Sequence, residues 1–249
     1  MKAMIFAAGL GTRLKPLTDS MPKALVPVGG QPLLQHLLLK MKAAGIQDIT
    51  INVHHFAQQI IDFIDANSNF GLDIHISDET DELLETGGGF RKALPLIGEH
   101  EPVLVHNVDI LSNLDFKHLM AAHNPNDAAT LVVSERTTSR YLLFDENRHL
   151  CGWTNVTTRQ VKPEGIDAEN YMPLAFSGIQ IISPLLFQYM QEMPKRFSLI
   201  DLYLHTLDKE KLTAYIPQHF QMMDVGKIDT LADADQFAEQ LKNNRYGLE

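Results

Sequence analysis

The fold is indicated by an apolar run followed by a glycine-rich loop: residues 3–8 read Ala3-Met4-Ile5-Phe6-Ala7-Ala8, and residues 9–13 read Gly9-Leu10-Gly11-Thr12-Arg13. An uninterrupted apolar run of this length is typical of a strand buried on both faces of a parallel sheet. The loop follows the carboxyl end of this strand, which is where open α/β sheets bind ligands. The opening of the chain therefore predicts an α/β fold with a binding site directly after its first strand.

Strand and helix patterns alternate through the first half of the chain. Strands are predicted at 49–53, 72–76 and 102–108, and helices at 33–41, 56–64 and 90–96. Alternation at this interval produces βαβ units, whose crossover helices cover both faces of an open sheet. The sequence predicts a Rossmann-like, three-layer α/β/α architecture with a mostly parallel central sheet.

From about residue 127 the pattern changes to shorter strands. We predict strands at 128–135, 141–145, 150–153, 175–182, 212–216 and 221–225, and a polar, irregular segment at 157–171. A helix is expected to begin at Pro184, and a final helix at 230–242 has Leu231, Ala234, Phe237 and Leu241 on one face. No repeat or linker divides the chain, so we predict one domain over residues 1–249 with two halves, 1–126 and 127–249.

Composition excludes several classes of protein. Of the 249 residues, 45% are apolar, and the formal charge is −10. An acidic chain is a poor ligand for nucleic acid or an anionic membrane, and no stretch reaches the roughly 18 apolar residues of a membrane span. The single cysteine, Cys151, cannot form an internal disulfide, which fits a reducing cytoplasm. We expect a cytoplasmic protein, a monomer or small homo-oligomer, with no nucleic-acid or membrane partner.

The glycine-rich loop has the chemistry of a phosphate site. Gly9 and Gly11 would let backbone amides approach phosphate oxygens closely, Arg13 offers a planar fork and Lys23 a point charge. No Gly-Lys-Ser/Thr follows, and the spacing is not that of a dinucleotide fingerprint. A tight turn at the strand exit would explain the glycines, but not Arg13, Pro22 and Lys23.

This block resembles the signature of the sugar-phosphate nucleotidyltransferase family, through Ala8-Gly9-Leu10-Gly11-Thr12-Arg13-Leu14 and Pro22-Lys23-Ala24-Leu25. The resemblance extends over most of the chain and implies the nucleotide-diphospho-sugar transferase type of fold. It also implies an enzyme that joins a nucleoside triphosphate (NTP) to a sugar 1-phosphate, releasing pyrophosphate. The half at 1–126 would bind the nucleotide and the half at 127–249 the sugar. The nucleotide would contact Ala8, Gly9, Gly11, Thr12, Arg13 and Lys23.

Four further segments resemble parts of the same family. Leu84-Glu85-Thr86-Gly87-Gly88-Gly89 is similar to a segment that holds the nucleobase in the branch making UDP-N-acetylmuramate, and in mannose-1-phosphate guanylyltransferases. Thr86 and Gly87 would then contact the base, the alternative being a flexible loop. Asn107-Val108-Asp109 resembles the family's Asn-x-Asp, and Phe176-Ser177-Gly178-Ile179 resembles a sugar-site strand. Asp224-Val225-Gly226 resembles a second metal-binding aspartate with the glycine that follows it.

The two aspartates are the predicted metal ligands. Asp109 and Asp224 each end a predicted strand, and two carboxylates beside phosphates are the ligands that Mg²⁺ prefers. Taken singly, either aspartate would be a turn residue or a helix cap. Asn107 and Ser177 are expected to contact the sugar, and Gly152 to let the sugar approach. The Lys162-Pro163 pair is similar to a sugar-phosphate motif, with Val161 where the motif has glutamate.

The expected mechanism needs no general base. The second pKa of a phosphate monoester is about 6, so the sugar 1-phosphate is largely a dianion at neutral pH and can attack the α-phosphorus directly. Arg13, Lys23 and Asp109 are the predicted catalytic residues. Lys23 would bridge the reacting phosphates, Arg13 would stabilise the departing pyrophosphate, and Mg²⁺ on Asp109 and Asp224 would hold the phosphates.

The identity of the substrates is less readable. The short chain and residues 85–88 favour UTP with N-acetylmuramate 1-phosphate. The alternatives are mannose 1-phosphate with GTP, glucose 1-phosphate with UTP or dTTP, and phosphocholine with CTP. A non-catalytic nucleotide sensor is expected to lack Arg13, Lys23, Asp109 or Asp224, and all four are present.

Overall fold

Four parallel strands, in the order β6-β1-β4-β5, form the centre of the sheet in the computed structural model, which describes residues 1–243. Their bounds are Lys2–Phe6 (β1), Asp48–Val53 (β4), Asp73–Asp78 (β5) and Val103–Asn107 (β6). Ala3, Met4 and Ile5 are fully buried, because each face of β1 is covered by helices. The predicted strand that opens the chain is confirmed.

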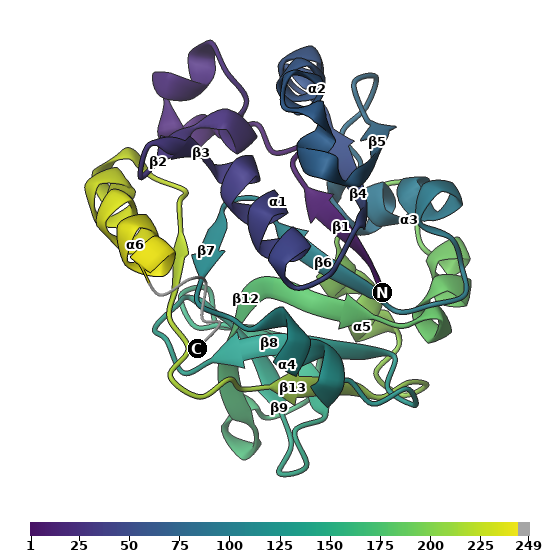
Figure 1. Ribbon diagram of the computed structural model, residues 1–249. Helices are drawn as coiled ribbons and strands as arrows, with labels where there is room; N and C mark the ends of the chain where they lie inside the picture. The colour runs from purple at the N-terminus through teal and green to yellow at the C-terminus, as the bar shows by residue number, and fades with distance from the viewer. Residues whose placement is uncertain (244–249) are drawn as a thin grey trace.

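The helices form two layers, one on each face of this sheet (Figure 1). Ala3 and Ile5 point to the core shared with α1 (Leu33–Ala43), α2 (Ala57–Ala66) and α4 (Phe116–Ala122). Met4 and Phe6 point to the opposite core, which is shared with α3 (Glu85–Ile97) and α5 (Leu199–His205). Side chains of one strand thus point alternately into two helix-covered cores, and the architecture has the predicted three α/β/α layers.

The second half of the chain adds mostly antiparallel strands to this core. The long β12 (Met172–Ile182) pairs antiparallel with β6, with β8 (Ala129–Ser134) and with β9 (Arg140–Phe144). Beyond β9 the sheet continues through β10 (Leu150–Asn155) to β11 (Gln160–Lys162), while β13 (Leu212–Tyr215) pairs parallel with β8. The sheet is therefore mixed, and its parallel part is the half that carries the glycine-rich loop.

A smaller layer surrounds that loop. The short β7 (Ile110–Ser112) pairs antiparallel with β14 (Met222–Asp224), and β2 (Pro27–Val28) pairs with β3 (Gln31–Pro32). The last helix, α6 (Leu231–Asn243), lies beside β2 and β7 (Figure 1) and packs its predicted apolar face onto Leu14, Val28 and Leu111. Helix α6 thereby packs against the segment that follows the glycine-rich loop.

Three predicted elements differ from the structure. The helix predicted at 90–96 already begins at Glu85, so the three glycines at 87–89 are helical and not a loop. The segment at 157–171 contains the edge strand β11 and a 3₁₀ turn, because its polar side chains suit an exposed sheet edge. The helix at Pro184 is a 3₁₀ helix, Pro184–Glu192. Within residues 1–243, no helix has both the length and the apolar character needed to cross a membrane.

Candidate active site

A pocket of about 370 Å³ opens at the carboxyl ends of the parallel strands. The end of β1 with the first loop, the amino-terminal turn of α3, the ends of β4 and β5, and the segment after β6 all contribute to its lining. The lining residues are Phe6, Ala7, Ala8, Gly9, Lys23, Asn52, Glu79, Leu83, Glu85, Thr86, Asn107, Val108, Asp109 and Ser198. This is the edge at which a ligand site was predicted.

The two glycines of the loop have different structural roles. Gly11 has φ +64°, and a Cβ atom there would lie 2.8 Å from the side chain of Thr18. The Thr18 hydroxyl donates to the Gly11 carbonyl at 2.8 Å, and the Leu14 amide donates to the same oxygen at 2.8 Å. A Cβ atom on Gly9 would meet no atom within 4 Å. Gly11 therefore fixes the turn, while Gly9 leaves open space at the pocket wall.

Lys23 and Asp109 form an ion pair at the pocket. Lys23 begins a 3₁₀ turn after Pro22 and is only 8% exposed, and its Nζ atom donates to Oδ2 of Asp109. Asp109 lies between β6 and β7, and its side chain is 22% exposed. Two residues predicted as catalytic are thus in direct contact within the same pocket.

Asp224 is brought to Asp109 by the pairing of β7 with β14. Asp224 is the register partner of Ile110, and the Val225 amide donates to the Asp109 carbonyl at 2.8 Å. Burial raises the pKa of the Asp224 carboxyl, the neighbouring Asp109 carboxylate raises it further, and Lys23 and Arg13 oppose both effects. The two predicted metal ligands therefore lie close enough to repel one another.

Arg13 lies over the turn that follows Asp224. A Cβ atom on Gly226 would be 2.7 Å from the Asp224 carboxylate and 3.0 Å from the Arg13 guanidinium. The absence of a side chain at Gly226 thus allows both groups to approach the same backbone. Arg13, Lys23, Asp109 and Asp224 converge on one place, so the predicted phosphate and metal residues form a single cluster.

The residues predicted to bind base and sugar are only partly brought together. Thr86 and Asn107 line the pocket. Gly87 instead faces Phe197, whose ring would lie 2.3 Å from a Cβ atom there, and its amide donates to the Phe197 carbonyl at 2.9 Å. Close packing of α3 explains this glycine, and the same packing overrides the low helix propensity of the glycine run.

Gly152 and Ser177 are not among the residues that line the pocket. A Cβ atom on Gly152 would be 2.5 Å from Ile166 and 2.6 Å from the Lys162 carbonyl, so the crossing of β10 and the following segment requires glycine. Ser177 is 1% exposed, and its hydroxyl donates to the Val132 carbonyl at 2.7 Å. In this structure both residues serve the packing of the sheet.

Lys162 lies on the same side of the molecule as Ser198. Its ammonium is 3.8 Å from Asp201 and 5.7 Å from the centre of the Trp153 ring. Asp201 in turn accepts from the hydroxyl of Ser198, a pocket residue, at 2.7 Å. Lys162 is therefore linked to the pocket through two side chains.

Sequence reasoning did not single out Asn52, Glu79 or Ser198. Asn52 is a buried polar residue one position before the carboxyl end of β4, and Glu79 follows β5 directly. A polar side chain at this position of a buried strand is a signal that could have marked the site.

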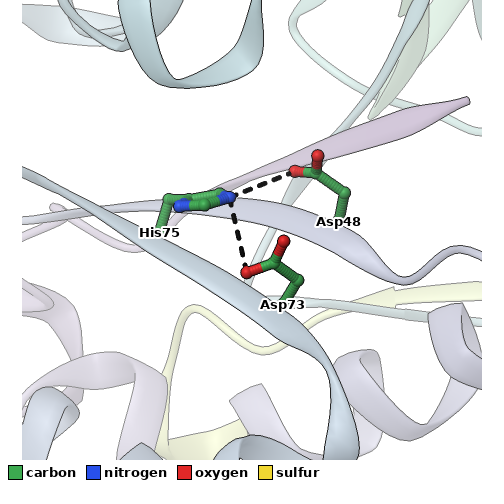
Figure 2. Close-up of side chains that lie close together, drawn as sticks. All are labelled: Asp48, Asp73 and His75. Carbon is green, nitrogen blue, oxygen red and sulfur yellow. Dashed lines mark ion pairs between the residues drawn. The ribbon is translucent and has the colours of Figure 1, made fainter.

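A second group of side chains has the spacing of metal ligands, but it lies at the opposite edge of the sheet. Figure 2 shows His75 between the carboxylates of Asp48 and Asp73, with its Nε2 atom 3.6 Å from each. These residues are at the amino-terminal ends of β4 and β5. Lys2 already pairs with Asp48 at 3.0 Å, so we interpret these residues as a group of ion pairs at the edge of the sheet and not as a metal site.

Comparison with known proteins agrees with this geometry. Residues 2–241 match the family model described as Nucleotidyl transferase. The chain is 33% identical, over 88% of its length and 90% of the relative, to N-acetylmuramate alpha-1-phosphate uridylyltransferase of Caulobacter vibrioides. A protein of that name from Neisseria meningitidis is 47% identical over 47% of this chain and 50% of the relative. A mannose-1-phosphate guanyltransferase of Gibberella zeae is 33% identical over 57% of this chain, but only 40% of the relative is covered.

Solved structures share the fold. A putative glucose-1-phosphate thymidylyltransferase from Bacillus anthracis superposes with a TM-score of 0.79 at 21% identity, covering 96% of this chain and 95% of that one. A UDP-glucose pyrophosphorylase in complex with UDP-glucose gives a TM-score of 0.77 at 18% identity, covering 96% and 99%. The chain belongs to the nucleotidyltransferase family. Within it, the chain is an enzyme of the sugar-phosphate nucleotidyltransferase type, with a role in sugar nucleotide biosynthesis.

Proposed function

We propose that this enzyme joins UTP to N-acetylmuramate 1-phosphate, making UDP-N-acetylmuramate and pyrophosphate. The choice of substrates is supported by the Caulobacter vibrioides relative, which matches nearly end to end. The chemistry rests on one observation, the contact of Lys23 with Asp109 in the pocket beside Asp224. The predicted reducing, cytoplasmic location belongs to the same proposal.

The reaction is a direct displacement at the α-phosphorus of the triphosphate. An oxygen of the sugar phosphate forms the new bond, and the bond from the α-phosphorus to its bridging oxygen breaks, so that pyrophosphate leaves. Lys23 neutralises the two phosphates that approach one another, and Arg13 with the loop amides stabilises the departing pyrophosphate. The attacking group is already ionised, so no side chain has to remove a proton.

Asp109 and Asp224 fit a divalent cation. They bring two carboxylates to the phosphate cluster, one from the residue before β7 and one from the last residue of β14, and few carboxylates combined with waters and phosphate oxygens suit Mg²⁺. When bound there, Mg²⁺ supplies positive charge that polarises the phosphate oxygens. The neighbouring Asp109 carboxylate raises the pKa of the Asp224 carboxyl, and a divalent cation held by these two residues would offset their repulsion.

A guanylyltransferase acting on mannose 1-phosphate is the second candidate, because relatives of that name match more than half of this chain. The deciding experiment is a competition. UTP and GTP are each supplied with N-acetylmuramate, N-acetylglucosamine, glucose and mannose 1-phosphates, and pyrophosphate release is measured. We expect the highest kcat/KM for UTP with N-acetylmuramate 1-phosphate, and a maximum for GTP with mannose 1-phosphate would establish the alternative.

A further inference from the structure

Glu79 is a fully buried carboxylate in the wall of the nucleotide pocket. It is 0% exposed and follows β5, where its amide donates to the Val53 carbonyl at 2.8 Å. Its two oxygens accept hydrogen bonds from different elements: Oε1 from the Asn52 amide at 2.6 Å, and Oε2 from the backbone amide of Leu84 at 3.0 Å. A buried acidic group is costly unless such donors surround it. The Asn52 and Leu84 donors therefore stabilise the buried Glu79 carboxylate, and the carboxylate in turn satisfies both donors.

The orientation of the Asn52 side chain follows from its other contact. Its Oδ1 atom accepts from the backbone amide of Ala7 at 2.8 Å, so its NH₂ group must face Glu79. Three hydrogen bonds in series thus connect Ala7, Asn52, Glu79 and Leu84. Each donor in this series meets one acceptor, so a reversal at any point leaves two donors or two acceptors face to face.

The third glycine of α3 belongs to the same arrangement. A Cβ atom on Gly89 would lie 2.5 Å from Oε1 of Glu79 and 3.1 Å from the Asn52 nitrogen. Only a residue without a side chain lets the helix pack directly on this hydrogen bond. Packing on the Asn52–Glu79 bond therefore accounts for a glycine that sequence reasoning attributed to the nucleobase or to a flexible loop.

The series joins the two walls of the pocket. Ala7 leads into the loop at Gly9 on one wall, and Leu84 leads into Thr86 on the other, while Asn52 and Glu79 themselves line the pocket between them. We propose that Asn52 and Glu79 are positioning residues, whose mutual hydrogen bond holds these two walls at the separation that an NTP requires. The inference rests on NTP binding, which is part of the proposed function, and is independent of the sugar.

A reversal of the hydrogen bond tests this role. Glu79→Gln turns an NH₂ group towards either Asn52 or the Leu84 amide, and Asn52→Asp places two carboxyl groups together. In the double variant, the introduced aspartate accepts from Ala7 and from the introduced glutamine, whose oxygen accepts from Leu84. Every donor again meets an acceptor, although the bond between the two side chains now runs in the opposite direction.

The readout is the Kd of the NTP that the wild-type enzyme binds most tightly, measured by calorimetry with Mg²⁺. A buried polar group left without its partner destabilises the arrangement that contains it by an amount equivalent to about 10- to 100-fold in an equilibrium constant. We therefore expect each single variant to raise the Kd of the NTP by about 10- to 100-fold. The double variant should return to within about fivefold of wild type. KM for the NTP should rise more than kcat falls, because neither side chain touches the reacting atoms.

A matched control is Glu82→Gln, which changes an exposed carboxylate that pairs with Lys195 near the same wall. Its Kd should equal that of wild type. Single variants that melt earlier yet bind the NTP normally would reduce the series to a structural role and overturn the proposal, as would a double variant no better than the weaker single one. The double variant alone decides the matter if a single variant does not fold. Failure to make UDP-N-acetylmuramate with normal NTP binding would refute only the proposed substrates.

Discussion

Lys23 and Asp109 are in direct contact although 86 residues separate them in the sequence. The contact requires the turn after Pro22 to fold back over the carboxyl ends of β1 and β6, since the two residues arrive from different βαβ units. A buried lysine paired with a carboxylate is also held in one position, ready to meet phosphate charge.

The carboxylates are expected to be indispensable for turnover. Asp109→Asn and Asp224→Asn should each lower kcat by about 100-fold or more, because a neutral amide holds Mg²⁺ poorly and leaves phosphate charge uncompensated. Asp224→Asn should melt like wild type, whereas Asp109→Asn should lower Tm, because it leaves the buried Lys23 ammonium without its carboxylate partner. Initial rates with and without excess EDTA provide the measurement. Asp229→Asn, on the exposed segment before α6, is the control, and full turnover in EDTA would contradict a metal-dependent reaction.

Lys23 should contribute more to the transition state than to nucleotide binding. Lys23→Ala should lower kcat by a larger factor than it raises Kd for the NTP, because negative charge accumulates most at the α-phosphorus during the displacement. Lys15→Ala removes an exposed lysine of the same segment, which pairs with Asp19 at 3.0 Å, and should leave kcat nearly unchanged. An unchanged kcat for Lys23→Ala with weaker NTP binding would assign Lys23 to ground-state binding.

Gly9 and Gly11 should separate binding from stability. Gly11→Ala places a side chain in the left-handed region, at a cost of roughly 1–2 kcal/mol, and against Thr18, so it should lower Tm. Gly9→Ala finds open space and should melt like wild type. Its methyl group instead projects where phosphate oxygens are expected, so Kd for the NTP should rise. Calorimetry and thermal melting on both variants check this, and equal Tm values would contradict the assigned roles.

The predictable part of this protein is the part governed by local patterns. The apolar run before Gly9 is typical of a buried strand, and the loop after such a strand lies at the carboxyl edge of the sheet. Asp109 and Asp224 were identified as strand ends in the same way, and β7 and β14 bring them together.

The remainder depends on contacts that no local pattern encodes. Gly87 is explained by the ring of Phe197, and Gly152 by Ile166, and in both cases the partner is distant in sequence or hidden in an irregular segment. Ser177 is predicted from the sequence to contact the sugar, but its hydroxyl donates to the Val132 carbonyl of the neighbouring strand β8. The strand-end position of Asn52 is visible in the sequence, but the role of Asn52 and Glu79 depends on the hydrogen bonds that they accept from Ala7 and Leu84.

Lys40 should make the stability of the protein depend on pH. Lys40 is a buried residue of α1. Its ammonium donates to the Ser112 carbonyl at 2.6 Å and lies 4.7 Å from the centre of the Phe116 ring. Burial lowers the pKa of Lys40 to about 7, against a weak opposing effect of Asp115. The unfolded chain keeps this proton up to the ordinary lysine pKa, so between about pH 7 and pH 10 it binds more protons than the folded state. Stability contributed at this site therefore rises with pH through that window and is constant below it.

The variant Lys40→Met removes the titrating group and keeps most of the buried chain. The stability of Lys40→Met relative to wild type should be highest at pH 6 and should fall steadily towards pH 9. Wild type gains stability over this range because folded Lys40 becomes neutral while the unfolded chain stays protonated. Urea unfolding of both proteins across pH 6 to 9 measures the difference. Lys117→Met, at an exposed position of α4, should give a difference that does not vary with pH. A pH-independent difference for Lys40→Met would mean that Lys40 stays charged in the folded protein, held by Ser112 and the face of Phe116.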